Sequence, residues 1–231
     1  MDNKIKQLID DHSHKFSEWI DIVNFHNQRY SSEIELTIEE RVELSEKVVN
    51  VLGEISELFF EYGAFRDKFD NSKMYLNLYG PSLIIKSSKT DCTFYFGIDN
   101  NGFYLHTYLK HSDNLRYMDD TFYKDIFFLN DLGDFKLIEN EFYSGETRSK
   151  YPDFFNNNKS SVFRLLRNYF VGTVENERNI ILGDFQISWT YDANFYDIIS
   201  NGCIAFKALY KLNYSLWKVY DQQTRKKKTG R

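Results

Sequence analysis

The chain has 231 residues, of which 18% are aromatic, and its formal net charge is −5. This length can bury a sizeable core, and the negative charge disfavours a protein dedicated to coating nucleic acid. No stretch approaches about 18 consecutive apolar residues, so we expect no transmembrane helix and no membrane partner. Because only two cysteines are present and the N-terminus does not resemble a signal peptide, we expect a cytoplasmic protein with reduced thiols.

Residues 1–70 are predicted to form a helical hairpin. Apolar residues recur at helical spacing over residues 5–23 and again over residues 42–62. Between them, Thr37 and Glu40 have the spacing of a capping box, which marks the start of the second helix. Two long amphipathic helices joined by a short polar break are typical of an antiparallel pair.

The period of the apolar residues changes from helical to alternating near Met74, which opens a predicted α+β region over residues 71–223. Asn101-Gly102 lies between two runs rich in β-forming residues, a pattern that strongly predicts a β-hairpin. We expect the strands of a central antiparallel sheet at residues 75–79, 83–86, 93–98, 103–109, 135–143 and 180–189.

Three helices are predicted to follow the first strands. Asp119 or Asp120 caps a short one, Ser160 or Ser161 caps a second, and a long C-terminal helix opens at Asp192. We expect this last helix to pack on one face of the sheet, within one compact domain. Residues 224–231 are basic and contain no apolar residue, so we expect a disordered tail.

The aromatic residues suggest a function in protein binding. Alternation along the predicted hairpin places Tyr95, Tyr104 and Tyr108 on the face opposite its apolar residues, and the long helix adds a second aromatic surface with Tyr214 and Trp217. Tyrosine and tryptophan are favoured at protein interfaces, although a second layer of helices would also account for such a face. We therefore predict a non-enzymatic subunit, inhibitor or sensor that binds another protein without a cofactor or metal.

The source and the oligomeric state are less closely defined by the sequence. The abundance of Asn, Lys, Ile, Tyr and Phe is typical of AT-rich genomes and favours a bacterial or phage system, with host–phage conflict as one setting. A homo-oligomer is compatible with the same aromatic surfaces.

A magnesium-dependent nuclease is the alternative. Asp134 and Lys136 have the acidic-x-Lys spacing found in some nucleases, and Asp119 and Asp120 are upstream carboxylates. The spacing is short and arises easily by chance in a charged chain. The chain contains no nucleophile elbow, no phosphate-binding glycine loop and no dinucleotide fingerprint.

Nucleic-acid binding without cleavage is a related alternative. Arg164 and Arg167 lie on a predicted helix, and Lys226, Lys227 and Lys228 lie in the basic tail. Such side chains contact phosphates, while exposed aromatic rings stack on unpaired bases. The overall acidity opposes this interpretation.

Overall fold

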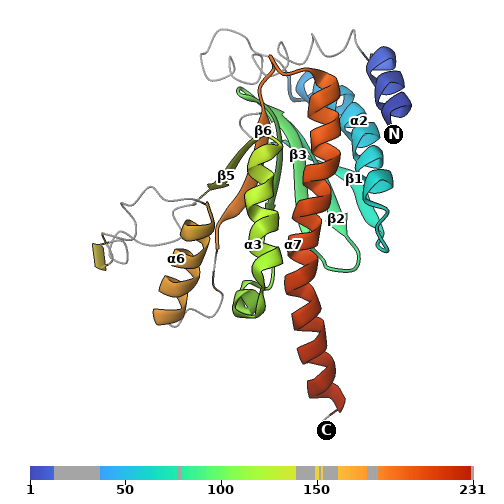
Figure 1. The fold of residues 1–231 in the computed structure, drawn as a ribbon. Coiled ribbons are helices and arrows are strands. Elements are labelled where there is room, and N and C mark those ends of the chain that lie inside the picture. Colours follow the sequence, from blue (N-terminus) through green and yellow to red (C-terminus); the bar gives the residue numbers. More distant parts are fainter. Residues whose placement is uncertain are drawn as a thin grey trace.

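The computed structural model describes residues 1–12, 37–76, 80–138, 149–150, 152, 161–175, 180 and 182–229. Within them, six strands form one antiparallel sheet in the order β1-β2-β3-β4-β6-β5 (Figure 1). The strands are β1 (Phe69–Leu76), β2 (Pro81–Ser87), β3 (Thr93–Asp99), β4 (Gly102–Tyr108), β5 (Asp134–Ile138) and β6 (Asp184–Trp189). The predicted α+β fold with a central antiparallel sheet is confirmed.

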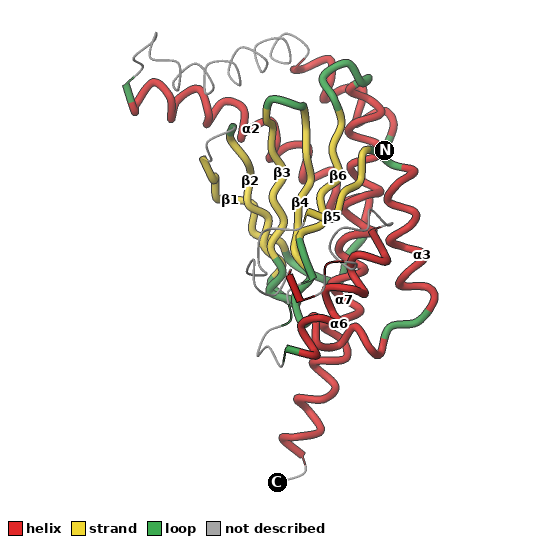
Figure 2. Tube along the Cα trace, turned by 90° about the vertical axis from the view of Figure 1, so that its left-hand side faces the viewer, coloured by secondary structure: helices red, strands yellow, loops and turns green. Residues whose placement is uncertain are grey.

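Helices cover one face of this sheet. They are α2 (Ile38–Gly63), α3 (Asp120–Phe128), α6 (Ser161–Val174) and α7 (Phe195–Thr229), with the 3-10 turns η1 (Ser112–Tyr117) and η2 (Leu129–Asp131). α7 and α3 lie along the sheet, α2 packs against β1, β2 and α7, and α6 contacts α3 and β5. In Figure 2 the strands stand on one side of α3 and α7, and no described helix lies over the opposite face.

The N-terminal helical hairpin is confirmed by its two described arms. A helical segment over residues 2–12 runs antiparallel to α2, with Lys4 Nζ 2.6 Å from Glu61 and His12 Nε2 2.8 Å from Glu54. The rest of the first predicted helix, to residue 23, and the polar break predicted over residues 29–35 lie outside the described part of the chain. None of the described helices is long and apolar enough to cross a membrane.

Local capping patterns predicted the helix starts well. Thr37 and Glu40 form the expected capping box, in which the Thr37 hydroxyl accepts from the Glu40 N–H at 3.2 Å. Asp119 is the N-cap of α3, and its carboxylate accepts two backbone N–H groups of the first turn. The start of α7 was predicted wrongly: Asp192 does not open it, because Asn194 accepts a first-turn N–H at 2.8 Å.

The core lies between the sheet and α7, and Phe206 is central to it. Its ring centroid lies between 4.8 and 5.7 Å from those of Phe59, Phe60, Phe65, Phe69 and Phe94. Asn213 adds a buried polar connection, because its Oδ1 accepts the Lys110 N–H at 3.0 Å and its Nδ2 donates to Thr107 at 3.4 Å. These contacts hold α7 against β4.

Further boundaries differ from the predictions, among them the start of β6 at Asp184 rather than at residue 180. β1 begins at Phe69 rather than at residue 75, and its polar start contains a register shift between Asp70 and Lys73 that obscures the alternation. The expected disordered tail is wrong for residues 224–229, which continue α7. Arg225 pairs there with Asp221 at 2.9 Å one turn earlier, and Lys, Arg and Gln are good helix formers.

Candidate functional site

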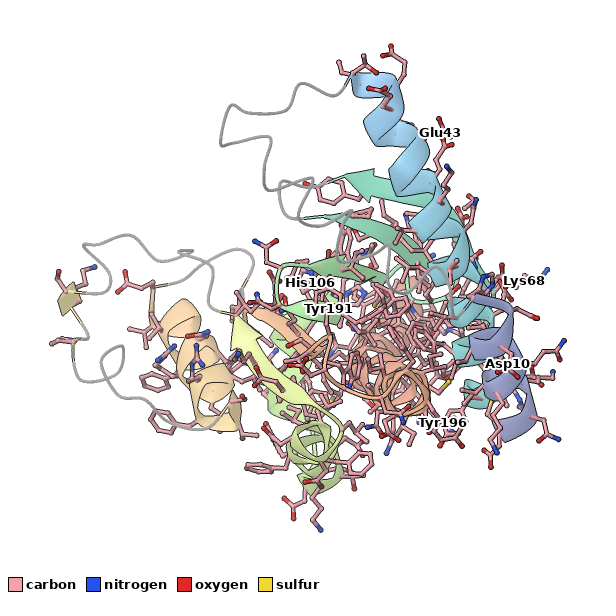
Figure 3. The ribbon with its side chains drawn as sticks, turned by 90° about the horizontal axis from the view of Figure 1, so that it is seen from above. Asp10, Glu43, Lys68, His106, Tyr191 and Tyr196 are labelled. Carbon is pink, nitrogen blue, oxygen red and sulfur yellow. The ribbon has the colours of Figure 1, made fainter. Side chains whose placement is uncertain are left out.

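Among the described residues, four tyrosines lie on the sheet face away from α3 and α7, which we call the tyrosine face. They are Tyr75, Tyr95, Tyr104 and Tyr108. Their neighbours in β3 and β4 point the other way, into the core. His106, the register partner of Tyr95, belongs to the same face and lies away from α7 in Figure 3. The predicted grouping of Tyr95, Tyr104 and Tyr108 on one side of the hairpin is therefore seen in the structure.

These tyrosines surround a hollow of about 490 Å³, which we call the tyrosine pocket. Its described lining residues come from five strands of the sheet: Tyr75, Ser82, Tyr95, Tyr104, His106, Tyr108 and Asp184. The pocket is thus a product of strand order, because β1 and β6 contribute from either side of the central hairpin.

Small residues create the concavity. Ser82 and Gly97 are cross-strand partners in the middle of the face, and Gly97 pairs in turn with Tyr104. A Cβ added at Gly97 would lie 2.6 Å from both the Tyr104 hydroxyl oxygen and the Ser82 Cβ. Glycine is therefore required here so that the Tyr104 ring can lie close to the backbone, leaving larger rings to form the walls.

The walls meet at steep angles. The Tyr75 and Tyr95 rings are 6.1 Å apart at an interplanar angle of 66°, whereas Tyr95 stacks on His106 at 5.5 Å and 25°. Burial raises the pKa of Tyr95, with smaller contributions from neighbouring acidic groups. The pocket therefore presents phenol rings in two orientations.

One wall carries two potential hydrogen-bond acceptors. Asp184 faces Tyr108 in the register of β4 and β6, and its Oδ2 lies 3.4 Å from His106 Nε2. The two atoms do not form a hydrogen bond. His106 Nε2 is a buried nitrogen with no hydrogen-bond partner among the described residues. A buried polar atom without a hydrogen-bond partner is uncommon in proteins.

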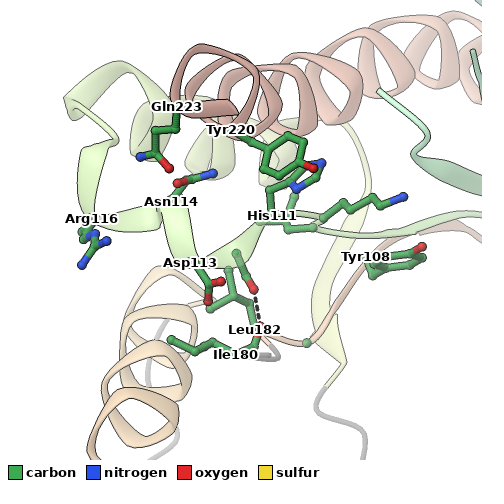
Figure 4. A pocket seen from close by; sticks show the side chains of 13 residues that line it. Tyr108, His111, Asp113, Asn114, Arg116, Ile180, Leu182, Tyr220 and Gln223 are labelled. Atoms are coloured by element: carbon green, nitrogen blue, oxygen red, sulfur yellow. Dashed lines mark hydrogen bonds between the residues drawn. The ribbon is translucent and has the colours of Figure 1, made fainter. Parts of the chain in front are cut away.

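A second, larger hollow of about 650 Å³ lies between η1, the start of β6 and α7 (Figure 4). Tyr108 lines both hollows, and several other polar side chains of the larger one are already engaged within the fold. The Ser112 hydroxyl donates to the Ile180 carbonyl, Asn114 Nδ2 donates to an α7 carbonyl at 3.2 Å, and the His111 ring stacks on Tyr220 at 4.1 Å. Because these groups serve the fold, the tyrosine pocket is the better candidate for binding despite its smaller volume.

Tyr214 and Trp217 do not belong to the tyrosine face. They lie on α7 with ring centroids 5.4 Å apart, on the helical side of the sheet. The Nζ of Lys89 lies 5.0 Å and 5.6 Å from the two ring centroids, a cation–π arrangement within the chain. The rings on α7 therefore form a second aromatic surface, separate from the tyrosine face, as the sequence suggested.

The predicted nuclease residues are not brought together. Asp119 and Asp120 stand at the start of α3 on the helical side, where Asp119 is occupied as the N-cap. Asp134 and Lys136 are exposed on β5, and their side chains pair with each other. The described residues contain no group of three or more His, Cys, Asp or Glu side chains placed to hold a metal ion.

The residues predicted to contact phosphates lie on two helices, α6 and the end of α7. Arg167 is only 3% exposed and donates from Nε and Nη2 to Asn168 Oδ1 at 3.2 and 3.0 Å, so it faces the interior of the fold. Arg164 is partly buried, which lowers its pKa. The exposed segment Lys226, Lys227 and Lys228 lies on the last turns of α7, which project away from α6 (Figure 1).

Sequence reasoning missed Tyr75 and Asp184 as site residues. Both lie on strands that were predicted in part, but their approach to the hairpin depends on the pairing of β1 with β2 and of β6 with β4. The chain matches no family model, no curated protein and no solved structure. A function for it must therefore follow from the chemistry of its own residues.

Proposed function

We propose that this protein is a non-enzymatic interaction component, a subunit, inhibitor or sensor, that binds another protein through the tyrosine face. The observation that carries the proposal is the convergence of four tyrosines from three strands around one hollow, on a sheet face over which no described helix lies. Tyrosine combines a large apolar ring with a hydroxyl that tolerates water, and it is enriched among the residues that dominate binding energy.

The exposures of the rings suit an anchoring surface. Tyr75 is 50% exposed and Tyr108 is 40% exposed, whereas Tyr104 is only 7% exposed and is held over Gly97. A partner can therefore bury two accessible rings against a floor that is already ordered. Little side-chain freedom is lost at the floor, which favours affinity.

The charges of this face favour a protein over a polyanion. Lys86 pairs with Asp91 at 2.8 Å, and Lys136 pairs with Asp134. Phosphate binding draws its energy from cations that release their counterions, and each of these two lysines already contacts a carboxylate, although Asp91 is shared with Lys110. Base stacking on the tyrosines remains the competing mode, and the experiment below distinguishes it.

The first test is capture of a partner by the tagged full-length chain from a native-like lysate at low and high salt. Mass spectrometry and nucleic-acid staining identify what is bound. We expect one protein in stoichiometric amount that survives high salt, because apolar contacts are not screened. Nucleic acid that elutes with salt, without a stoichiometric protein, contradicts the proposal.

The location of the surface is tested with two exposed tyrosines. Tyr108→Ala should weaken capture of the partner by at least about tenfold, since truncation of an anchoring aromatic residue removes well over 1 kcal/mol. Tyr117→Ala is the matched control, because Tyr117 is 53% exposed on η1, beside α3 and α7. Equal capture by both variants rules out the tyrosine face as the binding surface.

A further inference from the structure

We propose that three cations at one end of the sheet bind the phosphate backbone of a nucleic-acid strand. This activity goes beyond the proposed function and uses a different surface. Arg66 and Lys68 lie in the connection from α2 to β1, and Lys89 lies in the turn from β2 to β3. We call these three residues the cationic corner. They line an open hollow of about 530 Å³, whose described lining is completed by Phe65, Asp67 and Ser88.

The side chains of the cationic corner contact no carboxylate among the described residues. All three are exposed, and Lys68 lies at the periphery of the molecule in Figure 3. By contrast, Lys86 and Lys110, at the same end of the sheet, both contact Asp91. Positive charges that line one hollow repel each other unless an anion joins them. The corner therefore has the charge pattern of a site for an anionic ligand.

Asp67 holds the two segments of the cationic corner together. Its Oδ1 accepts the backbone N–H groups of Lys68 at 2.7 Å and of Lys89 at 3.0 Å. Its Oδ2 accepts the hydroxyl groups of Ser87 at 2.6 Å and of Tyr210 at 2.8 Å. These donors occupy the carboxylate, and the three cations of the hollow outnumber it. Both segments are ordered before a ligand arrives, which reduces the freedom lost on binding.

Two aromatic rings adjoin the corner. The Nζ of Lys89 lies 5.0 Å from the ring centroid of Tyr214 and 5.6 Å from that of Trp217, and both rings are partly exposed. A cation–π contact neutralises no charge, so the ammonium group still attracts an anion. Cations beside aromatic rings are typical of surfaces that bind single-stranded nucleic acids. A carboxylate-rich protein segment would use the cations but not the rings, so these contacts favour a nucleic-acid strand.

Further positive charge lies along α7 beyond these rings. Lys228 follows Trp217 by eleven positions, or about three helical turns, so the two share a face of α7 about 16 Å apart. Arg225, between them, is paired with Asp221. The net charge of −5 acts only weakly against such a local surface, because charges separated by more than about 8 Å are largely screened at physiological ionic strength. A strand that binds the corner and follows α7 therefore remains close to cations.

The test measures binding of a dye-labelled oligothymidine strand to the full-length chain by fluorescence anisotropy over a range of salt concentrations. Each phosphate contact with a single strand contributes about −0.7 to the slope of log affinity against log salt. We therefore expect saturable binding at low salt with a slope of about −2 or steeper.

Two variants locate the contacts. Lys68→Gln and Lys89→Gln should each weaken binding by at least about threefold at low salt and make the salt slope shallower by about 0.7. Lys124→Gln is the matched control, because it removes the same charge from an exposed position on α3 outside the hollow. It should leave the slope unchanged. The salt slope of the unaltered chain keeps the test decisive even where a variant folds poorly.

Four results overturn the proposal. They are the absence of saturable binding at low salt, an unchanged slope in both Lys68→Gln and Lys89→Gln, an equal loss in Lys124→Gln, and tighter binding of poly-glutamate than of the oligothymidine. None of them bears on the partner protein. In the capture experiment, this site should bring down salt-sensitive nucleic acid in addition to the stoichiometric protein, whereas absence of that protein is the separate failure of the proposed function.

Discussion

The two faces of the β3–β4 hairpin differ in what their rings contact. On the helical side, Phe94 and Phe96 are at most 1% exposed and pack against α2 and α7. On the opposite side, Tyr95 and Tyr108 retain contact with solvent while their rings line the tyrosine pocket. Residues adjacent in sequence thus have different surroundings. Phenylalanine occupies positions where the ring is fully buried, and tyrosine occupies positions where one edge of the ring contacts solvent.

The largest expected effect is a loss of stability on the helical side of the sheet, where the rings are enclosed. Phe206→Ala should lower the free energy of unfolding by about 3–5 kcal/mol, because it opens a cavity among five packed rings. Tyr75→Ala, which shortens an exposed ring of the tyrosine face, should cost less than about 1 kcal/mol. Urea unfolding curves of the two variants measure the difference. A similar loss for both contradicts the distinction between the faces.

An intermediate effect is expected at the floor of the tyrosine pocket. Gly97→Ala should cost about 1–3 kcal/mol and displace the Tyr104 ring, because the new methyl group collides with Ser82 and Tyr104. Gly53→Ala in α2 is the matched control, since a Cβ there meets nothing within 4 Å. It should stabilise the helix by about 0.5–1 kcal/mol. Unfolding midpoints and the Tyr104 ring signals measure both, and unaltered Tyr104 signals in Gly97→Ala count against the close approach.

The smallest expected effect on stability concerns Asp91 and the two lysines that contact it. Hydrogen bonds from Lys110 and Lys86 lower the pKa of Asp91 to about 2, from an ordinary value of 3.8. Because the folded value is the lower one, the stabilisation is present above about pH 3.8 and is lost as the pH falls through about 2. Asp91→Asn should therefore cost less than about 1 kcal/mol at neutral pH, since the pair is exposed.

The pH dependence distinguishes this charge effect from a backbone effect. Asp91 has a positive φ of 55°, a conformation that asparagine also adopts readily. The stability difference between Asp91→Asn and the unaltered chain should thus vanish near pH 2, as measured by urea unfolding. A difference that persists there would indicate that the turn itself, rather than the ion pairs, is altered.

Local patterns predicted the elements whose cause lies within a few residues. Asn101-Gly102 produces the β3–β4 turn, Thr37 with Glu40 starts α2, and Asp119 caps α3. Elements whose position depends on contacts with distant segments were predicted less well. The start of β1 is polar and is held in the sheet by pairing with β2, which no short-range pattern reveals.

The residues of the candidate site also differ in whether a local pattern or a distant contact brings them together. Alternation in the hairpin places Tyr95, Tyr104 and Tyr108 together, because side chains two residues apart in a strand share a face. Tyr75 and Asp184 join them only through the order of the strands, and Tyr214 and Trp217 are separated from them by the sheet. Arg167 looked like a surface cation in sequence, yet its helix turns it inward.

The sequence by itself determined the α+β class, the hairpin, the long C-terminal helix and the division of the hairpin into an apolar face and a tyrosine face. These follow from periodicity and capping, which act between residues close along the chain. Tertiary structure alone decided that no described helix lies over the second face of the sheet, and that Tyr75 and Asp184 complete the pocket. The physical reason is that strand order and helix docking depend on burial summed over contacts between distant segments.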